Sequence, residues 1–253
     1  MAGMTTLGSA GDGGVVIGNC RLATQGTGVV SAVIDARTFV LDGKREVRLA
    51  GVEIAAAGEA EQAKVALTES LLGQPVVLRG AGQETDRYGR FVAQVFAGPE
   101  GFERWIQSDM IARGAARVAA RIGDRGCAAE LLARERAARD AKLGLWAEPY
   151  YSVRRAEDPS TIAADLGRFA VVEGRVLSVR ESGGTIYVNF GRRWSEDFTV
   201  TILKRNERSF AAAGLDPKRL DGQRVRVRGF IEVRGGPWIE ALRPEQIELL
   251  ERN

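Results

Sequence analysis

The chain has 253 residues, of which 45% are hydrophobic and 27% charged, and it carries a net charge of +3. These proportions are typical of a globular protein, and the length allows one large domain or two ordinary ones. The sequence has no run of about 18 apolar residues, which excludes a membrane-spanning helix. It also has no histidine, which excludes a Ser-His-Asp triad, a Cys-His pair and any His-ligated metal.

The positive charge is concentrated in the C-terminal part of the chain. Residues from 166 onward include 16 basic and 12 acidic side chains, whereas the first 165 residues include 20 basic and 21 acidic ones. So small an excess fits a polyanionic partner there, and it fits simple solubility equally well.

The first part of the chain predicts strands interrupted by three helices. Residues 1–27 are rich in glycine, and we expect them to form a flexible segment. The elements expected next are three strands within 28–52, a helix at 59–72, two strands on either side of 86–90, and helices at 104–113 and 127–143. Glycines at positions 73, 114 and 144 follow these helices, as is usual at helix C-termini.

The second part predicts another all-β domain. Residues 148–167 contain two prolines and mixed charges without a clear period, and we expect them to form a linker. From 168 to 253 the pattern predicts three strands, a short helix at about 204–213, and a hairpin that turns at Gly235-Gly236.

Two segments carry the most specific pattern, VIDARTFVLDGKREVRLAGVEIAA at 33–56 and DRYGR at 86–90. They resemble the thermonuclease (staphylococcal-nuclease-like) family. The usual sequence motifs of that family are D-G-D-T, R-L-x-G-[IV]-D-x-P-E and D-[RK]-Y-G-R. GAARV at 114–118 and GLW at 144–146 follow in the family's order. The resemblance covers 28–147 and implies a five-stranded OB barrel with three helices. Residues 168–253 resemble a bacterial OB-type module, so the expected fold class is α+β, mainly β, with two barrels.

The resemblance also implies a site, and the sequence departs from it in the acidic half. The family holds one calcium ion with carboxylates, activates water with a glutamate, and binds phosphate with two arginines. Arg48 and Arg90 match the arginines, whereas Asp35 and Glu53 are the remaining candidates for metal ligands. Arg37 stands where the family has an acidic ligand, and Ala55 and Ala56 replace the proline and the catalytic glutamate.

Three functional hypotheses follow from this pattern. The first is a degenerate nuclease-like protein that binds single-stranded DNA or RNA, or a protein partner, with little or no hydrolysis. It needs no cofactor and would use Arg37, Arg87 and Tyr88 beside the matched arginines. The second is an altered endonuclease that uses calcium with Asp35, Glu53 or Glu59. The third is a structural subunit of a larger assembly, in which both barrels are scaffolds. Arg48 also has a structural interpretation of its own, in which it forms a salt bridge with Glu53 or Asp35.

The C-terminal domain offers a second group of candidates. Aromatic residues can stack on bases and arginines can contact phosphates. The candidates for nucleic-acid binding are Tyr187, Arg192, Arg193, Arg226 and Arg228. Trp194 is a further aromatic candidate, whereas Phe190 and Trp238 are better explained by core packing.

The two cysteines leave the redox compartment open. Cys20 and Cys127 are too far apart for a zinc-ligand motif, so they are either two small core residues or one disulfide, which the export of many family members would favour. The N-terminus lacks the basic region of a signal peptide. Both an exported and a cytoplasmic location are therefore compatible with the sequence.

Overall fold

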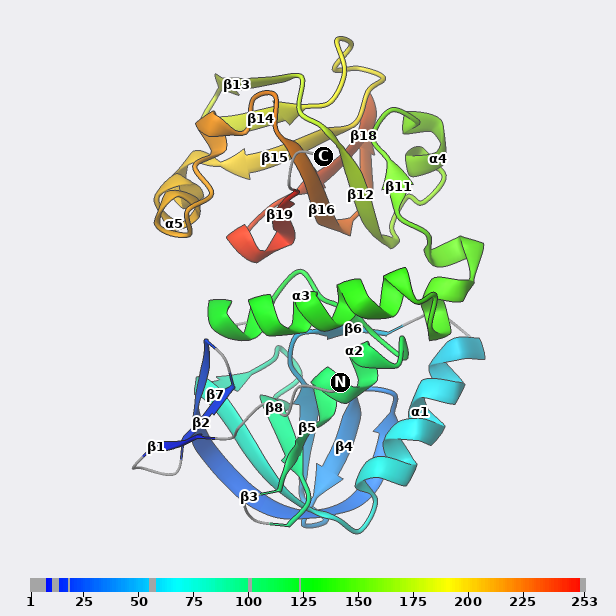
Figure 1. Ribbon diagram of the computed structural model, residues 1–253, viewed down its shortest axis with the longest axis vertical. Helices are drawn as coiled ribbons and strands as arrows, with labels where there is room; N and C mark the ends of the chain where they lie inside the picture. The colour runs from blue at the N-terminus through cyan, green and yellow to red at the C-terminus, as the bar shows by residue number, and fades with distance from the viewer. Residues whose placement is uncertain are drawn as a thin grey trace. The chain divides into compact units, whose positions relative to one another are not determined.

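The computed structural model describes residues 8–10, 14–17, 19–54, 58–99, 102–122 and 124–250 (Figure 1). The chain divides into two compact units, Met1–Pro149 and Tyr150–Asn253. The candidate residues of the nuclease-like pattern all fall in the first unit, and those of the C-terminal pattern fall in the second.

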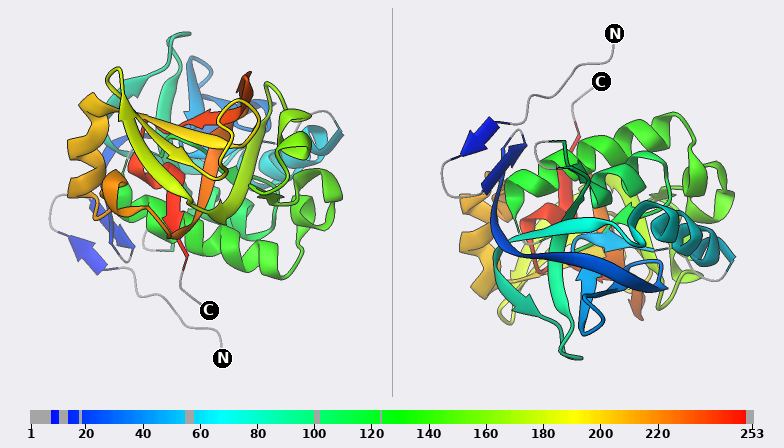
Figure 2. Two further views of the ribbon diagram at one scale, coloured as in Figure 1. Left: turned by 90° about the horizontal axis from the view of Figure 1, so that it is seen from above. Right: turned by 90° about the horizontal axis from the view of Figure 1, so that it is seen from below.

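The first unit is built on one strongly curved sheet. Its strands are β1 (Gly8–Ala10), β2 (Gly14–Ile17), β3 (Cys20–Asp35), β4 (Thr38–Leu41), β5 (Arg45–Leu49), β7 (Pro75–Thr85), β8 (Phe91–Ala97) and β9 (Arg104–Trp105). The order β3-β4-β5-β8-β7 closes into a barrel because β7 also pairs with β3, whose curvature can be followed in Figure 2. Two short strands, β6 (Val52–Glu53) and β10 (Arg117–Val118), pair with each other beside it.

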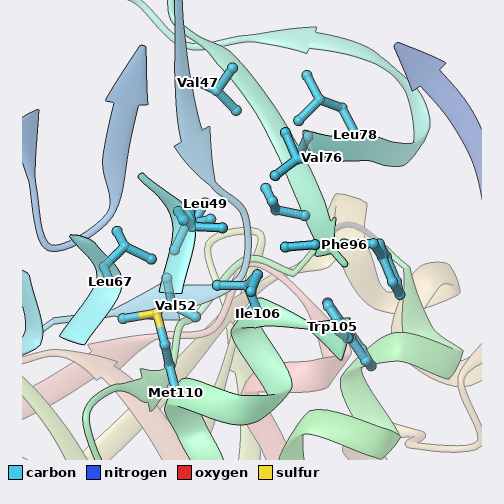
Figure 3. Close-up of a cluster of buried hydrophobic side chains, with 14 of the residues drawn as sticks. Val47, Leu49, Val52, Leu67, Val76, Leu78, Phe96, Trp105, Ile106 and Met110 are labelled. Carbon is cyan, nitrogen blue, oxygen red and sulfur yellow. The ribbon is translucent and has the colours of Figure 1, made fainter. Parts of the chain in front are cut away.

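Three α-helices accompany the barrel, as the sequence predicts: α1 (Gly58–Leu71), α2 (Ile106–Ala112) and α3 (Arg125–Asp140). Helix α1 buries Ala63, Leu67 and Leu71, which are four residues apart and therefore lie on one helical face. Figure 3 shows Leu67 of α1 and Ile106 and Met110 of α2 packed toward strand side chains such as Leu49. This apolar interior sets the positions of the loops that connect the strands.

The barrel begins earlier than the expected boundary at residue 28. Strand β3 starts at Cys20 and pairs with β2, β4 and β7, so residues 20–27 are part of the sheet rather than a flexible segment. Cys20 is joined to Cys127 at the start of α3 by a disulfide, and both side chains are buried. This covalent link and the ladder hydrogen bonds explain why a glycine-containing segment is ordered here.

The second unit consists of two sheets around a separate apolar core. One sheet has the order β11 (Arg154–Arg155), β12 (Phe169–Arg175), β16 (Arg224–Phe230), β19 (Ile247–Leu249). The other has the order β13 (Ser178–Ser182), β14 (Thr185–Asn189), β15 (Thr199–Leu203), β18 (Gly236–Glu240), β17 (Glu232–Arg234). Its α-helices are α4 (Pro159–Ala163) and α5 (Glu207–Ala212).

The expected linker at 148–167 is also different in the structure. Strand β11 pairs in parallel with β12, and Ile162 of α4 is fully buried in the core of the second unit. Asp158 caps α4 by accepting a hydrogen bond from the backbone N–H of Thr161. Only Ala156 and Ile162 of this segment enter the core. Because most of the other residues are charged or polar, the sequence pattern resembled that of a linker.

The fold class expected from the sequence, mainly β with α-helices, is confirmed. The remaining helical turns of the described chain are short 3₁₀ helices: η1 (Gly144–Ala147), η2 (Pro149–Tyr151), η3 (Lys204–Asn206), η4 (Pro217–Arg219) and η5 (Pro244–Gln246). Within the described ranges, no helix has the length and apolar character needed to cross a membrane. The assignment of the second unit to an OB-type family stays a prediction.

Candidate functional site

The DRYGR segment forms a tight turn between β7 and β8 that holds Arg90 in place. One carboxylate oxygen of Asp86 accepts hydrogen bonds from the backbone N–H groups of Tyr88 and Arg90, at 2.9 and 3.1 Å. The other accepts from the guanidinium of Arg90, with the Nε hydrogen bond at 2.8 Å and the terminal nitrogen at 2.7 Å. Gly89 has a φ of 80°, which glycine adopts without strain.

These contacts set the ionisation of both partners. Partial burial opposes the charged form of Asp86, but the hydrogen bonds from Arg90 and Tyr88 outweigh it, and the pKa of Asp86 is lowered. The same side-chain hydrogen bond raises the pKa of Arg90. Asp86 is therefore an ionised anchor for Arg90 and not a free carboxylate.

Arg37 lies in the turn between β3 and β4 and faces Glu53 of β6. Its backbone N–H donates to a carboxylate oxygen of Asp35 at 2.8 Å, and its guanidinium is 3.7 Å from the carboxylate of Glu53. Burial raises the pKa of Glu53, against the opposing influence of Arg37, Arg117 and Arg48. Arg117, which the sequence did not single out, comes close because β10 pairs with β6 opposite Glu53.

Arg48 of β5 lies opposite Thr38 and is partly buried. Burial lowers its pKa, and the positive charges of Arg37 and Arg90 lower it further, while Asp86 and Asp35 act in the opposite direction. No residue that the structure describes forms an ion pair with Arg48. The structural hypothesis of a salt bridge from Arg48 to Glu53 or Asp35 is therefore wrong for this structure.

A cavity of about 550 Å³ opens beside these side chains. Arg37, Arg48, Glu53 and Asp86 line it, whereas Arg90 does not. Gln94 lines it as well, and its Oε1 accepts a hydrogen bond from the indole of Trp105 at 2.8 Å. The amide nitrogen of Gln94 is buried and has no hydrogen-bond partner within the described ranges. Gln94 is the one polar residue in the strand sequence FVAQVFA, and a single polar residue in a strand does not by itself indicate a site.

The donor set does not fit the calcium ion that the resemblance implies. Calcium takes six to eight oxygen ligands, but a carboxylate oxygen of Asp35 already accepts from Arg37 and Glu53 faces the Arg37 guanidinium. A guanidinium cannot ligate a cation and repels one. Ala55 and Ala56, at the positions of the family's proline and catalytic glutamate, lie outside the described residues. Glu59 lies in the first turn of α1 and does not line the cavity.

Residues 46–148 match the family model described as staphylococcal nuclease homologue. This part of the chain is a staphylococcal nuclease homologue domain. The match runs from β5 to the end of η1 and includes Arg48, Glu53, Asp86 and Arg90, whereas Asp35 and Arg37 precede it. No curated protein matches the chain.

Within the nuclease homologue domain, Arg87 and Tyr88 form an exposed edge next to Arg90. The guanidinium carbons of Arg87 and Arg90 lie 4.9 and 5.0 Å from the ring centre of Tyr88, which is 68% exposed. A guanidinium within about 6 Å of a ring centre is attracted to the ring, so both arginines help to hold the exposed Tyr88 ring. The turn thus presents Tyr88 and two arginines together.

Two candidates of the second unit are not available for binding. Arg228 is fully buried and donates to Glu248 at 2.6 Å. Arg226 is 11% exposed and its guanidinium lies 2.7 Å from the carboxylate of Glu173. Arg226 and Arg228 alternate with valines along β16, as on a solvent-exposed strand face, but β12 and β19 supply carboxylates on both sides of it. Arg226 and Arg228 therefore form structural ion pairs with these carboxylates.

The remaining candidates of the second unit lie on its surface. Tyr187 and Arg192 line a groove on the five-stranded sheet, together with Trp194 and Trp238. Arg193 is exposed but paired with Glu196 at 3.0 Å. Phe190 packs against the core and Phe198, as expected, whereas Trp238 is only half-buried and faces the groove.

Proposed function

We propose that the nuclease homologue domain binds the phosphodiester backbone of single-stranded nucleic acid without hydrolysing it efficiently. Membership of residues 46–148 in this family suggests a nucleic-acid-related function. The observation that carries the finer proposal is Arg48, a partly buried guanidinium that has no ion-pair partner in the described chain. An unpaired, desolvated cation is costly, and a phosphate group offers the bidentate oxygen pair that matches a guanidinium.

The neighbours of Arg48 support an anionic ligand. Arg37 and Arg90 both lower the pKa of Arg48 through their charge, so two further guanidinium groups lie within electrostatic reach of Arg48. Arg37 and Arg48 also line the cavity. A bound phosphate would reduce the mutual repulsion of these groups, and the salt sensitivity of such binding is a general property of phosphate contacts.

The same residues argue against efficient hydrolysis. Arg37 brings a positive charge to the carboxylate that would have to ligate the metal, and alanine stands at the position of the general base. A positioned general base contributes about 10²–10⁴ in rate, and loss of a metal ligand lowers the rate further. The proposed binding function therefore needs no cofactor.

Binding is tested by fluorescence anisotropy with labelled single-stranded DNA and RNA over a salt titration. We expect affinity to fall as salt rises, and Arg48→Ala to weaken binding by about tenfold or more, the equivalent of one charge-assisted contact. Arg113→Ala is the matched control, since Arg113 is exposed at the end of α2 and does not line the cavity. Equal affinities of the wild type and Arg48→Ala would contradict the proposal.

Hydrolysis is tested on the same oligonucleotides with calcium, magnesium or manganese. We expect no chelator-sensitive cleavage by the wild type. Cleavage that a chelator abolishes and that Arg48→Ala removes would establish the altered nuclease instead. If the wild type neither binds nor cleaves at low salt, the protein-partner hypothesis takes the place of both.

A further inference from the structure

The second unit has a groove, here called the sheet groove, on the outer face of β13, β14, β15 and β18. Its volume is about 840 Å³, within the range of pockets that bury small ligands. Cross-strand pairing places Arg180, Tyr187, Thr201 and Glu240 in one row across these strands. Ser178, Asn189, Thr199 and Trp238 form the neighbouring row. Alternate residues such as Ile186 and Val200 point into the core, so the side chains of these two rows face away from it.

Aromatic rings are unusually accessible in the sheet groove. Tyr187 is 36% exposed and Trp194 is 74% exposed. Trp238 adds a second indole on the same face. Large aromatic side chains are normally buried because they remove so much apolar area from water, so three of them on one concave face indicate a surface that flat rings can cover.

Two buried polar groups of the sheet groove have no hydrogen-bond partner in the described chain. They are the indole nitrogen of Trp238 and the hydroxyl of Thr201, and Thr201 is only 9% exposed. Buried polar groups are nearly always hydrogen-bonded in folded proteins. A donor and a hydroxyl left unsatisfied on adjacent strands of one groove indicate that a polar ligand completes them.

The charges of the sheet groove favour an anion. Arg180, Arg192 and Arg234 line it, and none of them forms an ion pair with a described residue. Glu240 is the one carboxylate among the lining residues that the structure describes. Other arginines of the same unit are neutralised, as Arg193 is by Glu196 and Arg228 by Glu248. Three uncompensated positive charges therefore lie in the same groove as the aromatic rings.

We propose that the sheet groove is a second nucleic-acid site, which binds a short unpaired segment with its bases stacked on the aromatic side chains and its phosphates on the three free arginines. Duplex DNA and RNA keep their bases stacked on one another, and neither a free phosphate nor an acidic polysaccharide has an aromatic face. Bases with unpaired edges also supply acceptors and donors for Trp238 and Thr201. This proposal does not rest on phosphate binding at Arg48, because a different unit carries it.

The test uses the full chain and the quenching of tryptophan fluorescence by short single-stranded oligonucleotides. Trp194 and Trp238 line the groove, whereas Trp105 and Trp146 are buried in the first unit, so quenching reports on stacking in the groove. We expect quenching by single-stranded DNA or RNA and little by the same sequence as a duplex. Inorganic polyphosphate and a sulfated polysaccharide are expected to compete weakly, and competition as strong as that of the oligonucleotide would overturn the assignment.

Variants separate stacking from charge. Tyr187→Ala and Trp194→Ala are each expected to weaken groove binding about tenfold, which corresponds to one stacked base. Arg180→Ala is expected to weaken it and to reduce the salt slope by about one phosphate contact. Arg208→Ala, on the exposed side of α5 and outside the groove, is the charge control. Binding by both aromatic variants at wild-type strength would overturn the proposal.

These experiments can reject either of the two proposed binding sites without rejecting the other. Quenching that persists in Arg48→Ala and disappears in Tyr187→Ala supports the sheet groove even if the nuclease homologue domain binds nothing. Quenching that depends on Arg48 but not on Tyr187 or Trp194 overturns the sheet groove and leaves the first proposal standing.

Discussion

The guanidinium of Arg37 lies 3.7 Å from the carboxylate of Glu53, so two positions at which the resemblance implies acidic metal ligands form an ion pair instead. Arg37 and Glu53 are 31% and 20% exposed, so solvent screens their attraction and the pair adds little to stability. Its consequence is chemical, because it replaces a cation site by the protein's own cation. The predictions below follow from this relationship and from the contacts around it.

Replacement of Arg37 by aspartate is expected to create weak calcium binding. The change turns a repelling positive charge into a carboxylate near Asp35 and Glu53, and carboxylates supply calcium affinity. Isothermal titration calorimetry should show no calcium binding by the wild type and a dissociation constant on the order of 10⁻⁴–10⁻³ M for the variant. Arg113→Asp carries the same charge change away from the cavity, and calcium binding by that control would refute the explanation.

Arg48→Ala is expected to leave the fold at least as stable as the wild type while it weakens binding. Burial and two neighbouring arginines disfavour the Arg48 charge, so its removal relieves a cost, as at many functional sites. Chemical denaturation should give a free energy of unfolding within about 1 kcal/mol of the wild type or higher. Added inorganic phosphate is expected to stabilise the wild type and not the variant. A clear loss of stability in Arg48→Ala would show that the residue is structural.

Asp86→Asn is expected to destabilise the fold at neutral pH and to matter less in acid. The pKa of Asp86 is lowered in the folded state, so its ionised form contributes stability above its unfolded pKa. That contribution is lost as pH falls through the folded pKa. Denaturation should show a loss of about 1–2 kcal/mol at pH 7, which shrinks below about pH 4. Asp109→Asn, in an exposed pair with Arg104, is the control, and a pH-independent loss for Asp86→Asn would contradict the assignment.

Removal of the disulfide is expected to cost about 3–5 kcal/mol. Cys20 and Cys127 are separated by 107 residues, and a cross-link over a loop of that size restricts the unfolded chain strongly. Denaturation with and without reductant should reproduce the difference between the wild type and a Cys20→Ala/Cys127→Ala variant. The variant itself is expected to ignore the reductant. A wild type that is insensitive to reductant would contradict the prediction.

Arg228→Met is expected to destabilise the second unit and to leave nucleic-acid binding unchanged once folded. The change leaves the buried Glu248 without its closest partner, and removal of one member of a buried pair costs about 3–5 kcal/mol. Stability is measured by denaturation and binding by anisotropy, well below the unfolding midpoint. An unchanged stability together with weaker binding would restore Arg228 as a phosphate contact.

The sequence by itself determined the fold class, the nuclease-like barrel and its helices, because hydrophobic alternation and motif order are local properties of the chain. An arginine-rich segment such as RVRVRG shows that a strand carries arginines, but it does not show whether they face solvent. Glu173 on β12 and Glu248 on β19 decide that for Arg226 and Arg228, and sheet pairing brings both carboxylates in from distant parts of the sequence.

The state of the candidate sites was decided by tertiary structure alone. The sequence pattern at 33–56 identifies Arg37, Arg48 and Glu53 as candidate site residues. Only the closed barrel and the β6–β10 pairing show that Arg37 faces Glu53, while Arg48 has no ion-pair partner in the described chain. Likewise, the sequence identifies Tyr187 as an aromatic candidate for stacking, whereas Arg180 and Trp238 join it only through three cross-strand pairings. Whether a charged side chain is paired with an opposite charge depends on residues far apart in the sequence. The local sequence pattern therefore cannot predict it.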